Sequence, residues 1–513
     1  MRRRSSRRQG RNLTNMKILV DLRPALDGYS GIPQDARMLF SALAHSSGIE
    51  TFGLLQSGNL VLEPGLTLCR DGLAPKATSS DQVIDRLSQV VVSMQQGPVW
   101  HRAVWARRRL LEFAGPLGAA SKSLAGLATP LTAFDPQHFQ DFVWRAMFAK
   151  SLPVSDFDVV MSRQYRVLRW PWSRLNQIGV VTAALGKAVY PRLQTRGMDC
   201  FIAQTPYPGR VARGTRLVVR YHDAIPLLLP HTVRNRGFHR SMHFHALLRN
   251  ARDGAWFACD SEATRSDLLS VLPQLELRSA VIPPMVSHHF QLQTEGPERV
   301  ADVIWARKNR AAPAQGGAAI DPAQLASGAP RYLLMVSTLE PRKNHEALID
   351  AWELLRSRGF PDLHLVCVGS LGWDNEATLR RLEPWLERGG LHLLSGVPPQ
   401  DLCLLYRHAS ATVCPSLSEG FDLTGAEAMS AGGVVAASDI RVHRDVYGDA
   451  AVYFNPYVAT HMAEVLAALL RQSDGPDRAA RQAAGLGVAS HYKPEAVMPQ
   501  WQVFLERVHG QPA

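Results

Sequence analysis

The sequence of 513 residues lacks the features of a membrane-spanning or disulfide-linked protein. Its longest apolar stretch, residues 110–134, is interrupted by Lys122 and by several Gly and Pro, whereas a spanning helix needs roughly 20 continuous apolar residues. The six cysteines are scattered, with no CxxC pair and no neighbouring histidine at zinc-site spacing. This spacing argues against a disulfide scaffold and a structural metal site. We therefore expect no transmembrane segment and a location in the reducing cytoplasm.

Acidic residues are missing from residues 1–15, which contain six Arg. These arginines account for half of the formal net charge of +12, and the segment lacks the apolar core of a signal peptide. We expect residues 1–16 to form a disordered basic tail. Because Met16 is followed at once by Lys17 and the apolar run ILVDL, translation from Met16 is an alternative to translation from Met1.

The length and composition are those of an ordinary globular protein with more than one domain. Single hydrophobic cores stop growing near roughly 250 to 300 residues, so two or three domains are expected. Hydrophobic residues make up 46% of the sequence and charged residues 20%, which excludes a largely disordered or fibrous chain. Two domains that face a cleft are the simplest arrangement.

The first ordered segment, residues 17–44, predicts a strand, a Gly-containing loop and a helix from Arg37 to Ala44. Gly28 and Gly31 would let the loop turn tightly and approach a ligand, and a helix N-terminus favours anions. A simple turn is the alternative interpretation of these glycines.

Residues 60–200 contain few strand signals, so we expect mainly helices there. Within them the run WHRAVWARRRLLEF predicts a basic amphipathic helix. Such a helix could rest on anionic lipid, and a solvated helix face is the alternative. Its basic residues are Arg102, Arg107, Arg108 and Arg109, beside the apolar Trp100, Trp105, Leu110 and Phe113.

A polar pair follows the next clear strand. Residues 215–226, TRLVVRYHDAIP, predict a strand that ends at His222 and Asp223, and α/β sheets bind ligands at the carboxyl ends of their strands. A buried core histidine is the alternative at His222. A further strand precedes a helix that Asp260 or Ser261 can cap.

The second half of the chain alternates apolar strands with helices. Residues 309–330 are rich in Ala, Gly and Pro and predict a flexible connection, so the domain boundary is placed at residues 301–330. The near-continuous apolar strands after it predict a parallel sheet covered on both faces, in a protein of the α/β class. These strands are expected at residues 332–337, 363–368, 391–396, 411–416 and 434–438, with a helix at 424–430 before the last of them.

Three loops after these strands would meet at one edge of the sheet. The first, STLEPRKNH, places Arg342 and Lys343 just before a helix that starts near Asn344 and just after Ser337. Two cations beside a helix N-terminus fit a diphosphate. A solvated charge pair is the alternative.

The second and third loops add close backbone approach and two carboxylates. Gly369 and Gly372 lie in VGSLGWDNE, where backbone could approach a ligand and Trp373 could form a wall. Glu419 and Glu427 lie eight positions apart in PSLSEGFDLTGAEAMSAGG. Glu419 is expected in the loop and Glu427 about one turn inside the following helix. Carboxylates at two depths can bind hydroxyls of two different sugar rings.

Residues 332–470 resemble the C-terminal domain of glycosyltransferase family 4, a family of retaining GT-B enzymes that includes mannosyl-, rhamnosyl- and glucosyltransferases. Five segments carry the resemblance in the family's order: STLEPRKN, LVCVGSLGWDNE, SGVPPQDLCLLYRHA, PSLSEGFDLTGAEAMSAGG and ASDIRVHRDVYGDAAVYFNPY. The resemblance implies an α/β fold of the GT-B type, with two Rossmann-like domains facing a central cleft. The expected parts are an acceptor-binding domain with a helical insertion at 17–300, a nucleotide-sugar domain at 331–480, and a C-terminal helix at 481–513 that packs back toward the N-terminal domain.

The resemblance also implies roles for single residues. Glu419 would contact the donor sugar and Glu427 the nucleotide ribose. Arg342 and Lys343 would neutralise the leaving diphosphate, and the backbone near Val397 would meet the base. The other residues expected to line the donor site are Ser337, Gly369, Gly420, Phe421, Leu423 and Thr424.

The N-terminal half resembles the family in two short motifs. SGI, which contains Gly31, is similar to the family's first Gly loop, and YHDAIP is similar to its HD motif, whose His approaches the donor sugar. This makes His222 the leading catalytic candidate on the acceptor side, with Asp223 beside it. One departure is that many members have Gly and Pro where this chain has Asp422 and Thr424, so Asp422 is kept as a candidate sugar contact.

The expected reaction moves a hexose, with mannose as the first choice, from a nucleoside diphosphate sugar to an acceptor hydroxyl with retention at the anomeric carbon. GDP-mannose is the first donor choice, and no cofactor or metal ion is expected. The acceptor would be a glycan or lipid-linked glycan of surface polysaccharide or lipopolysaccharide, used by a cytoplasmic protein with peripheral contact to the inner membrane. The alternatives are a GT-B epimerase or phosphorylase, a basic nucleic-acid-binding protein, although no binding motif is present, and a non-catalytic GT-B scaffold.

Overall fold

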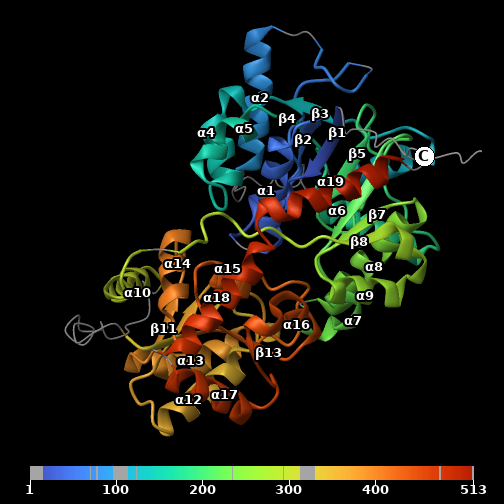
Figure 1. Ribbon diagram of the computed structural model, residues 1–513. Helices are drawn as coiled ribbons and strands as arrows, with labels where there is room; N and C mark the ends of the chain where they lie inside the picture. The colour runs from blue at the N-terminus through green and yellow to red at the C-terminus, as the bar shows by residue number, and fades with distance from the viewer. Residues whose placement is uncertain are drawn as a thin grey trace, which may run out of the picture.

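The computed structural model describes residues 15–29, 31–69, 71–76, 79–95, 114–122, 124–233, 235–292, 294–311, 330–472 and 475–510. These residues form two lobes, each built around its own sheet (Figure 1). Nearly all of the predicted basic tail, the Arg-rich helix expected around residues 100–113, and residues 312–329 of the predicted connection lie outside the described residues.

The N-terminal lobe contains an eight-stranded sheet of order β3-β4-β2-β1-β5-β6-β7-β8. Neighbouring strands are parallel except for β3 and β4, which are antiparallel. Its strands are β1 Met16–Asp21, β2 Ile49–Leu55, β3 Thr132–Phe134, β4 Gln164–Val167, β5 Cys200–Ala203, β6 Arg216–Tyr221, β7 Trp256–Cys259 and β8 Ser279–Val281. His222 and Ser261, which follow β6 and β7, both contact Gly420 of the second lobe.

Helices cover both faces of this sheet. They are α1 Ile32–His45, α2 Ser80–Met94, α4 Gln140–Val143, the π-helix η3 Trp144–Phe148, α5 Phe157–Met161, α6 Trp172–Ala184, α7 Ile225–Leu228, α8 Arg236–Arg252 and α9 Glu262–Val271. Short 3-10 helices lie at η1 Arg23–Leu26, η2 Pro136–His138, η4 Val154–Asp156, η5 Pro230–Thr232 and η6 Pro273–Arg278. Helix α1 begins five residues before the expected Arg37 because Pro33 lies in its first turn, where a helix tolerates proline. The mainly helical expectation for residues 60–200 missed β3 and β4, which have three and four residues and are too short to show an alternating pattern.

The C-terminal lobe contains a six-stranded parallel sheet of order β11-β10-β9-β12-β13-β14. Its elements are β9 Tyr332–Val336, η7 Pro341–Lys343, α12 His345–Ser357, β10 His364–Val368, α13 Glu376–Arg388, β11 Leu391–Leu394, α14 Pro399–His408, β12 Ala411–Cys414, α15 Leu423–Ser430, β13 Val435–Ser438, α16 Arg441–Tyr447, η8 Gly448–Ala450, β14 Val452–Phe454, α17 Ala459–Arg471 and α18 Pro476–Ser490. Successive residues of β9 enter opposite cores: Leu333 packs with α12 and α17, and Leu334 packs with α14 and α15. This burial on both faces explains the near-continuous apolar strands.

Helix α10, Glu298–Ala311, occupies the first third of the segment predicted as a flexible connection. Val300, Val303 and Ile304 lie on one helical stripe and are buried in the core of the C-terminal lobe, with Leu404 of α14. The prediction that the connection begins at residue 301 is therefore wrong, because three apolar residues at helical spacing outweigh the polar composition around them.

The last helix, α19 Pro494–Gly510, returns to the N-terminal lobe (Figure 1). Trp501 and Phe504 are buried in the core that contains β1, and the ring of Phe504 lies 6.0 Å from that of Trp256 in β7. None of the six cysteines, all of which the structure describes, forms a disulfide bond. Among the residues that the structure describes, none of the helices has the length and apolar character needed to cross a bilayer.

Candidate functional site

The paired cations Arg342 and Lys343 both contact the carboxylate of Glu419. The cations lie in η7, after β9, and Glu419 lies in the loop after β12. Arg342 Nη1 is 2.6 Å from Glu419 Oε2, and Lys343 Nζ is 2.5 Å from Glu419 Oε1. Because β9 and β12 are neighbours in the sheet, their carboxyl ends bring the two loops together. Three residues expected at the diphosphate and the donor sugar therefore form one cluster.

A second carboxylate, Glu340, shares Arg342 with Glu419. Arg342 Nη2 lies 2.7 Å from Glu340 Oε1, and the side chain of Glu340 is only 3% exposed. Burial raises the pKa of Glu340 while Arg342 opposes the shift. Burial also acts to raise the pKa of Glu419, but Arg342 and Lys343 outweigh it and hold that pKa below its ordinary value. The cluster thus keeps the Glu419 carboxylate ionised in a buried position.

Glu427 lies in α15 and contacts both lobes. Its Oε1 accepts a hydrogen bond from Gln34 Nε2 of α1 at 2.9 Å, and its Oε2 accepts one from the hydroxyl of Tyr406 at 3.2 Å. Glu427 is 4% exposed, and burial raises its pKa to about 8. The side chain expected to meet the ribose is therefore largely neutral at pH 7 and is held by a residue of the opposite lobe.

Asp422 caps helix α15. Its Oδ1 accepts a hydrogen bond from the backbone N–H of Thr424 at 3.1 Å, and its Oδ2 lies 3.3 Å from His443 Nε2. Burial acts to raise the pKa of Asp422, and the hydrogen bond and charge of His443 outweigh it and lower that pKa. The carboxylate kept as a candidate sugar contact is thus engaged inside the protein, as the N-terminus of a helix favours.

Ser337 and Gly369 lie side by side at the ends of β9 and β10. The backbone N–H of Ser337 donates to the carbonyl of Val368 at 2.9 Å, and its hydroxyl lies 3.3 Å from His345 Nε2. A side chain at Gly369 would collide with the carbonyl of Ser337. Glycine is needed here because two backbone segments touch.

The remaining donor-site candidates of this lobe take part in packing. Thr424 Oγ1 donates to the last carbonyl of β9 at 3.1 Å. Leu423 is 8% exposed in the core, and Phe421 packs edge-on against Tyr492 with ring centroids 5.0 Å apart. Val397 is half-buried against the same core. Their side chains therefore fix the shape of the loops around the Glu419 cluster.

Gly420 joins the loop of Glu419 to the N-terminal lobe. Its carbonyl accepts hydrogen bonds from Ser261 Oγ at 2.7 Å and from Thr264 Oγ1 at 2.9 Å. A side chain at position 420 would collide with the carbonyl of His222. The candidate sugar-binding loop of one lobe thus lies directly against the candidate catalytic histidine of the other.

His222 ends a line of charged groups in the N-terminal lobe. Its Nδ1 lies 2.8 Å from Asp260 Oδ2, Asp260 Oδ1 lies 3.1 Å from Arg220 Nη2, and Arg220 Nε lies 2.8 Å from Asp35 Oδ2. All four side chains are less than 10% exposed. Burial disfavours the charged imidazole, but the carboxylate of Asp260 outweighs it and raises the pKa of His222. The other ring nitrogen, Nε2, is buried without a hydrogen-bond partner among the described residues.

Gly31 is the N-cap of α1 and adopts a φ of 69°, a left-handed conformation that favours glycine. The first turn that follows carries both Gln34, which contacts Glu427, and Asp35, which contacts Arg220. The loop at Gly31 therefore precedes two contacts, one with the C-terminal lobe through Gln34 and one within the N-terminal lobe through Asp35.

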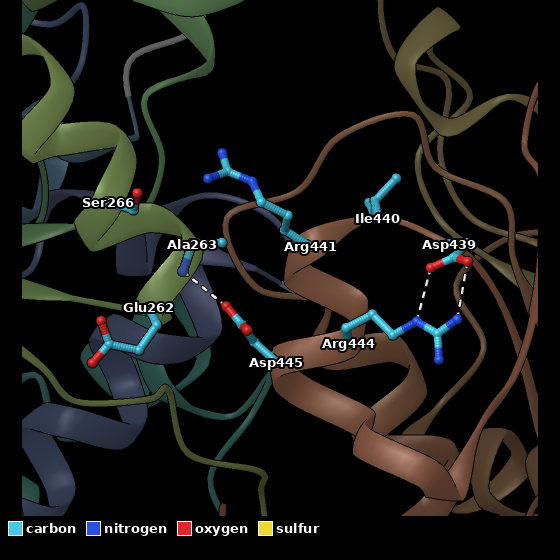
Figure 2. Close-up of a pocket in the computed structure, with 8 residues that line it drawn as sticks. All are labelled: Glu262, Ala263, Ser266, Asp439, Ile440, Arg441, Arg444 and Asp445. Carbon is cyan, nitrogen blue, oxygen red and sulfur yellow. Dashed lines mark hydrogen bonds and ion pairs between the residues drawn. The ribbon is translucent and has the colours of Figure 1, made fainter.

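Helices α9 and α16 form another contact between the lobes (Figure 2). Asp445 Oδ2 accepts a hydrogen bond from the backbone N–H of Ala263 at 2.8 Å, and Arg441 Nη2 lies 2.6 Å from Asp267 Oδ1. The carboxylate of Asp445 thereby sits at the N-terminus of α9, which favours negative charge. A cavity of about 460 Å³ lies between the two helices and is lined by Glu262, Ala263, Ser266, Asp439, Ile440, Arg441, Arg444 and Asp445.

A larger cavity of about 940 Å³ lies in the N-terminal lobe, at the carboxyl ends of β1 and β2. Arg23 and Asp27 follow β1, and Asn59 follows β2. The guanidinium of Arg23 stacks over Trp172 at 4.5 Å, which fixes its position. The other lining residues are Leu26, Ser57, Gly58, Leu60, Met94, Gln95, Asp141, Phe142, Arg145 and Ala146. Several hydrogen-bonding groups beside an aromatic ring suit a polyhydroxylated ligand.

Sequence reasoning missed Glu340, Gln34, Asp35 and Arg220 as members of the site, and it gave Asp260 only a capping role. The helix cap is Ser261, whose hydroxyl accepts from the backbone N–H of Thr264 at 3.1 Å. Glu340 could have been found as the acid nearest to the cation pair. Asp35 and Arg220 are 185 positions apart, so their pairing leaves no local signal.

The chain is similar to known proteins in the sequence of its C-terminal lobe and in its overall fold. Residues 318–485 match the family model for Glycosyl transferases group 1. The O-antigen chain mannosyltransferase B of Escherichia coli is 36% identical over 125 residues, which are 24% of this chain and 33% of that protein. The matched stretch spans about a third or less of the length of the curated relatives.

Two solved structures align over almost the whole chain. The alignment with sucrose-phosphate synthase from Thermosynechococcus elongatus has a TM-score of 0.55 at 13% identity and covers 96% of this chain and 99% of the synthase chain. The alignment with Anabaena HepE in complex with UDP and glucose has a TM-score of 0.52 at 13% identity and covers 96% of this chain and 100% of the HepE chain. At this identity both structures inform the fold alone. The fold is therefore GT-B, with two Rossmann-like lobes, and residues 318–485 match the glycosyl transferases group 1 family.

Proposed function

We propose that the protein is a retaining glycosyltransferase that moves a hexose from a nucleoside diphosphate sugar to an acceptor hydroxyl. The observation that carries this proposal is the cluster of Arg342, Lys343 and Glu419 at the ends of β9 and β12, with contact distances of 2.5 and 2.6 Å. Two fixed cations beside an ionised carboxylate suit a diphosphate next to a sugar. The family match of residues 318–485 and the O-antigen mannosyltransferase relative support the same activity.

The chemical step that needs stabilising is the departure of the diphosphate, because negative charge develops there. The charges of Arg342 and Lys343 are paired with Glu419 and Glu340. The arriving diphosphate would share these cations, and the carboxylate of Glu419 would then accept hydrogen bonds from hydroxyls of the donor sugar. Since side-chain cations neutralise the leaving group, the proposed reaction is metal-independent.

Retention is proposed to occur by attack of the acceptor on the same face from which the diphosphate leaves, within an oxocarbenium-like ion pair. Each oxygen of Glu419 lies against one cation, and in this proposal the carboxylate holds hydroxyls of the donor sugar and does not act as a nucleophile. A glycosyl-enzyme trapped on Glu419 would contradict this mechanism.

We propose that the acceptor binds in the cavity at the ends of β1 and β2. Its 940 Å³ volume and its polar lining around Phe142 suit part of a glycan or lipid-linked glycan. Asn59→Ala and Asp141→Ala should raise the KM for the acceptor and leave the KM for the donor unchanged. A change in the donor KM alone would exclude this cavity as the acceptor site.

GDP-mannose is the proposed donor, and surface polysaccharide or lipopolysaccharide synthesis at the cytoplasmic face of the inner membrane is the proposed setting. A thermal-shift screen of GDP-, UDP-, ADP- and dTDP-sugars tests the donor, since a ligand that binds only the folded state raises its melting temperature. The anomeric configuration of the product, read by NMR, tests retention. Stabilisation by none of these sugars, together with no transfer, would overturn the proposed function.

A further inference from the structure

Four buried charged groups form a line across the N-terminal lobe, in the order Asp35, Arg220, Asp260 and His222. The charges alternate in sign, and each neighbouring pair is separated by 2.8 to 3.1 Å. The groups come from three elements: Asp35 from α1, Arg220 and His222 from β6 and its end, and Asp260 from the end of β7. Buried charges are costly unless they are paired, so this line needs an explanation.

We propose that Asp260, supported by Arg220 and Asp35, is a positioning residue that keeps a proton on Nδ1 of His222 and presents Nε2 to the donor sugar. This inference rests on the proposed function, because it assigns a task to His222 within the same site. The carboxylate of Asp260 accepts a hydrogen bond from Nδ1–H. This contact fixes the orientation of the ring and, when the ring is neutral, favours the tautomer with the proton on Nδ1.

The two ring nitrogens differ in a way that points to a ligand. Nδ1 has its partner in Asp260 at 2.8 Å, whereas Nε2 is buried and has no hydrogen-bond partner among the described residues. Buried polar atoms are normally satisfied. The backbone of His222 touches Gly420, the neighbour of Glu419, so the residue lies beside the loop where the donor sugar is proposed to bind.

The charges around His222 come from both lobes. Asp260 and Asp35 favour the protonated ring, and Arg220 opposes it. Asp223 follows His222 directly and is coupled electrostatically to Arg342 and Glu419 of the other lobe. Burial disfavours protonation, and the net effect raises the pKa of His222. The ring therefore stays protonated on Nδ1, and it gains a proton on Nε2 at a higher pH than an ordinary histidine does.

Arg220 also has a structural role, which makes it a poor test position. Its Nη1 donates to the carbonyl of Ile282, and its guanidinium lies 5.6 Å from the ring of Trp501. Asp260→Asn removes one charge beside both His222 and Arg220, and Asp35 remains to pair with Arg220. Asparagine keeps the size of the side chain and can still accept a hydrogen bond from Nδ1–H.

The first experiment compares the pH dependence of kcat/KM for wild type and Asp260→Asn. We expect kcat/KM of the variant to fall about tenfold to a hundredfold, as for loss of a charge-assisted hydrogen bond. We also expect the limb of the pH profile that follows the titration of His222 to move to lower pH. His222→Gln should lack this limb. A limb at the wild-type position in a folded Asp260→Asn protein would overturn the proposal.

The matched control is Asp253→Asn, which also removes a carboxylate that contacts two basic side chains, in this case two arginines. Asp253 lies 2.7 Å from Arg210 and 3.0 Å from Arg249, at the far end of α8. We expect the pH profile of this variant to superimpose on that of wild type. The same shift in both variants would mean that the effect is one of net charge and would contradict a specific role for Asp260.

The second experiment needs neither a folded Asp260 variant nor a transfer assay. Long-range ¹H–¹⁵N spectra of the wild-type protein labelled at histidine report the tautomer and titration of each ring, and His222→Gln assigns the signal among the 18 histidines. We expect Nδ1–H at high pH and a titration above that of an ordinary histidine. An Nε2–H tautomer would overturn the inference even if sugar transfer is observed. An Nδ1–H tautomer without sugar transfer would support the pairing of His222 with Asp260 and count against the proposed function.

Discussion

The two lobes place their charges differently at the edges where they meet. In the C-terminal lobe two cations converge on one carboxylate, Glu419, which lies in a loop. In the N-terminal lobe single charges alternate along a buried line that ends at His222. A converging cluster can exchange one anion for another, whereas an alternating line holds one group in a fixed state. Under the proposed function, the cluster of the C-terminal lobe would bind the charged diphosphate, and the line of the N-terminal lobe would orient His222.

The Gly420 contact joins these two arrangements. Its carbonyl is held by Ser261 and Thr264, and its Cα packs on the backbone of His222. The loop that carries Glu419 is therefore positioned by the N-terminal lobe. Substitutions at the two edges should therefore have distinct effects. Those in the C-terminal lobe should weaken donor binding, and those in the N-terminal lobe should alter the orientation or the protonation of His222.

The largest effect is expected from removing a cation of the C-terminal cluster. Arg342→Ala or Lys343→Ala should slow sugar transfer by about a hundredfold or more, because one preorganised charge contact to a transition state contributes roughly 3 to 4 kcal/mol. Initial rates with the donor found by the screen measure this effect. Arg381→Ala is the matched control, since Arg381 also contacts two carboxylates, Asp350 and Glu353, on the surface of the same lobe. Equal losses in both variants would remove the special role of the cluster.

A side chain at Gly420 tests whether the lobes depend on their close contact. Gly420→Ala should lower the melting temperature and the transfer rate together, because the added methyl would collide with the carbonyl of His222. Overpacking of this kind costs roughly 1 to 3 kcal/mol. Gly487→Ala, in α18 with open space around it, is the control and should leave both quantities near wild type. Unchanged stability and activity in Gly420→Ala would show that the two edges work independently.

Glu427 connects the lobes through a neutral carboxyl group, and pH should reveal it. With a folded pKa of about 8 against an ordinary 4.5, its stabilising contribution is complete below pH 4.5 and is lost as the pH rises through about 8. The melting temperature of Glu427→Gln should therefore exceed that of wild type by an amount that grows between these pH values. The exposed Glu383→Gln serves as the control. A constant difference across this range would contradict a buried neutral Glu427.

The smallest effect is expected at the contact of α9 with α16. Asp445→Ala removes the acceptor of the Ala263 N–H, and an exposed charge at a helix N-terminus contributes about 0.3 to 1 kcal/mol. A melting temperature lowered by a few degrees or less, with normal transfer, is expected from calorimetry. Arg444→Ala alters a charge in the same cavity without a contact between the lobes. A large loss of transfer in Asp445→Ala would mean that this contact controls the site.

The sequence predicted the C-terminal lobe better than the N-terminal one for a physical reason. Strands buried on both faces give continuous apolar runs, and the loops after them must carry the ligand-binding residues, so Arg342, Lys343 and Glu419 could be grouped from local patterns. Asp35 and Arg220 are 185 positions apart and pair only because β6 and α1 meet in the fold. Asp260 stands beside a genuine cap residue, which concealed its contact with His222. Helix α10 was missed because its apolar stripe has only three buried residues among the side chains that the structure describes there.

The central claim is that Arg342 and Lys343 receive the diphosphate of the donor. Calorimetric titration with GDP and with guanosine tests it most directly, in wild type and in the Arg342→Ala, Lys343→Ala double variant; the nucleotide of the screen replaces GDP if another is found. We predict that wild type binds the diphosphate much more tightly than the nucleoside and that the double variant loses this preference while it still binds the nucleoside. A folded double variant that binds the diphosphate as tightly as wild type would contradict the account.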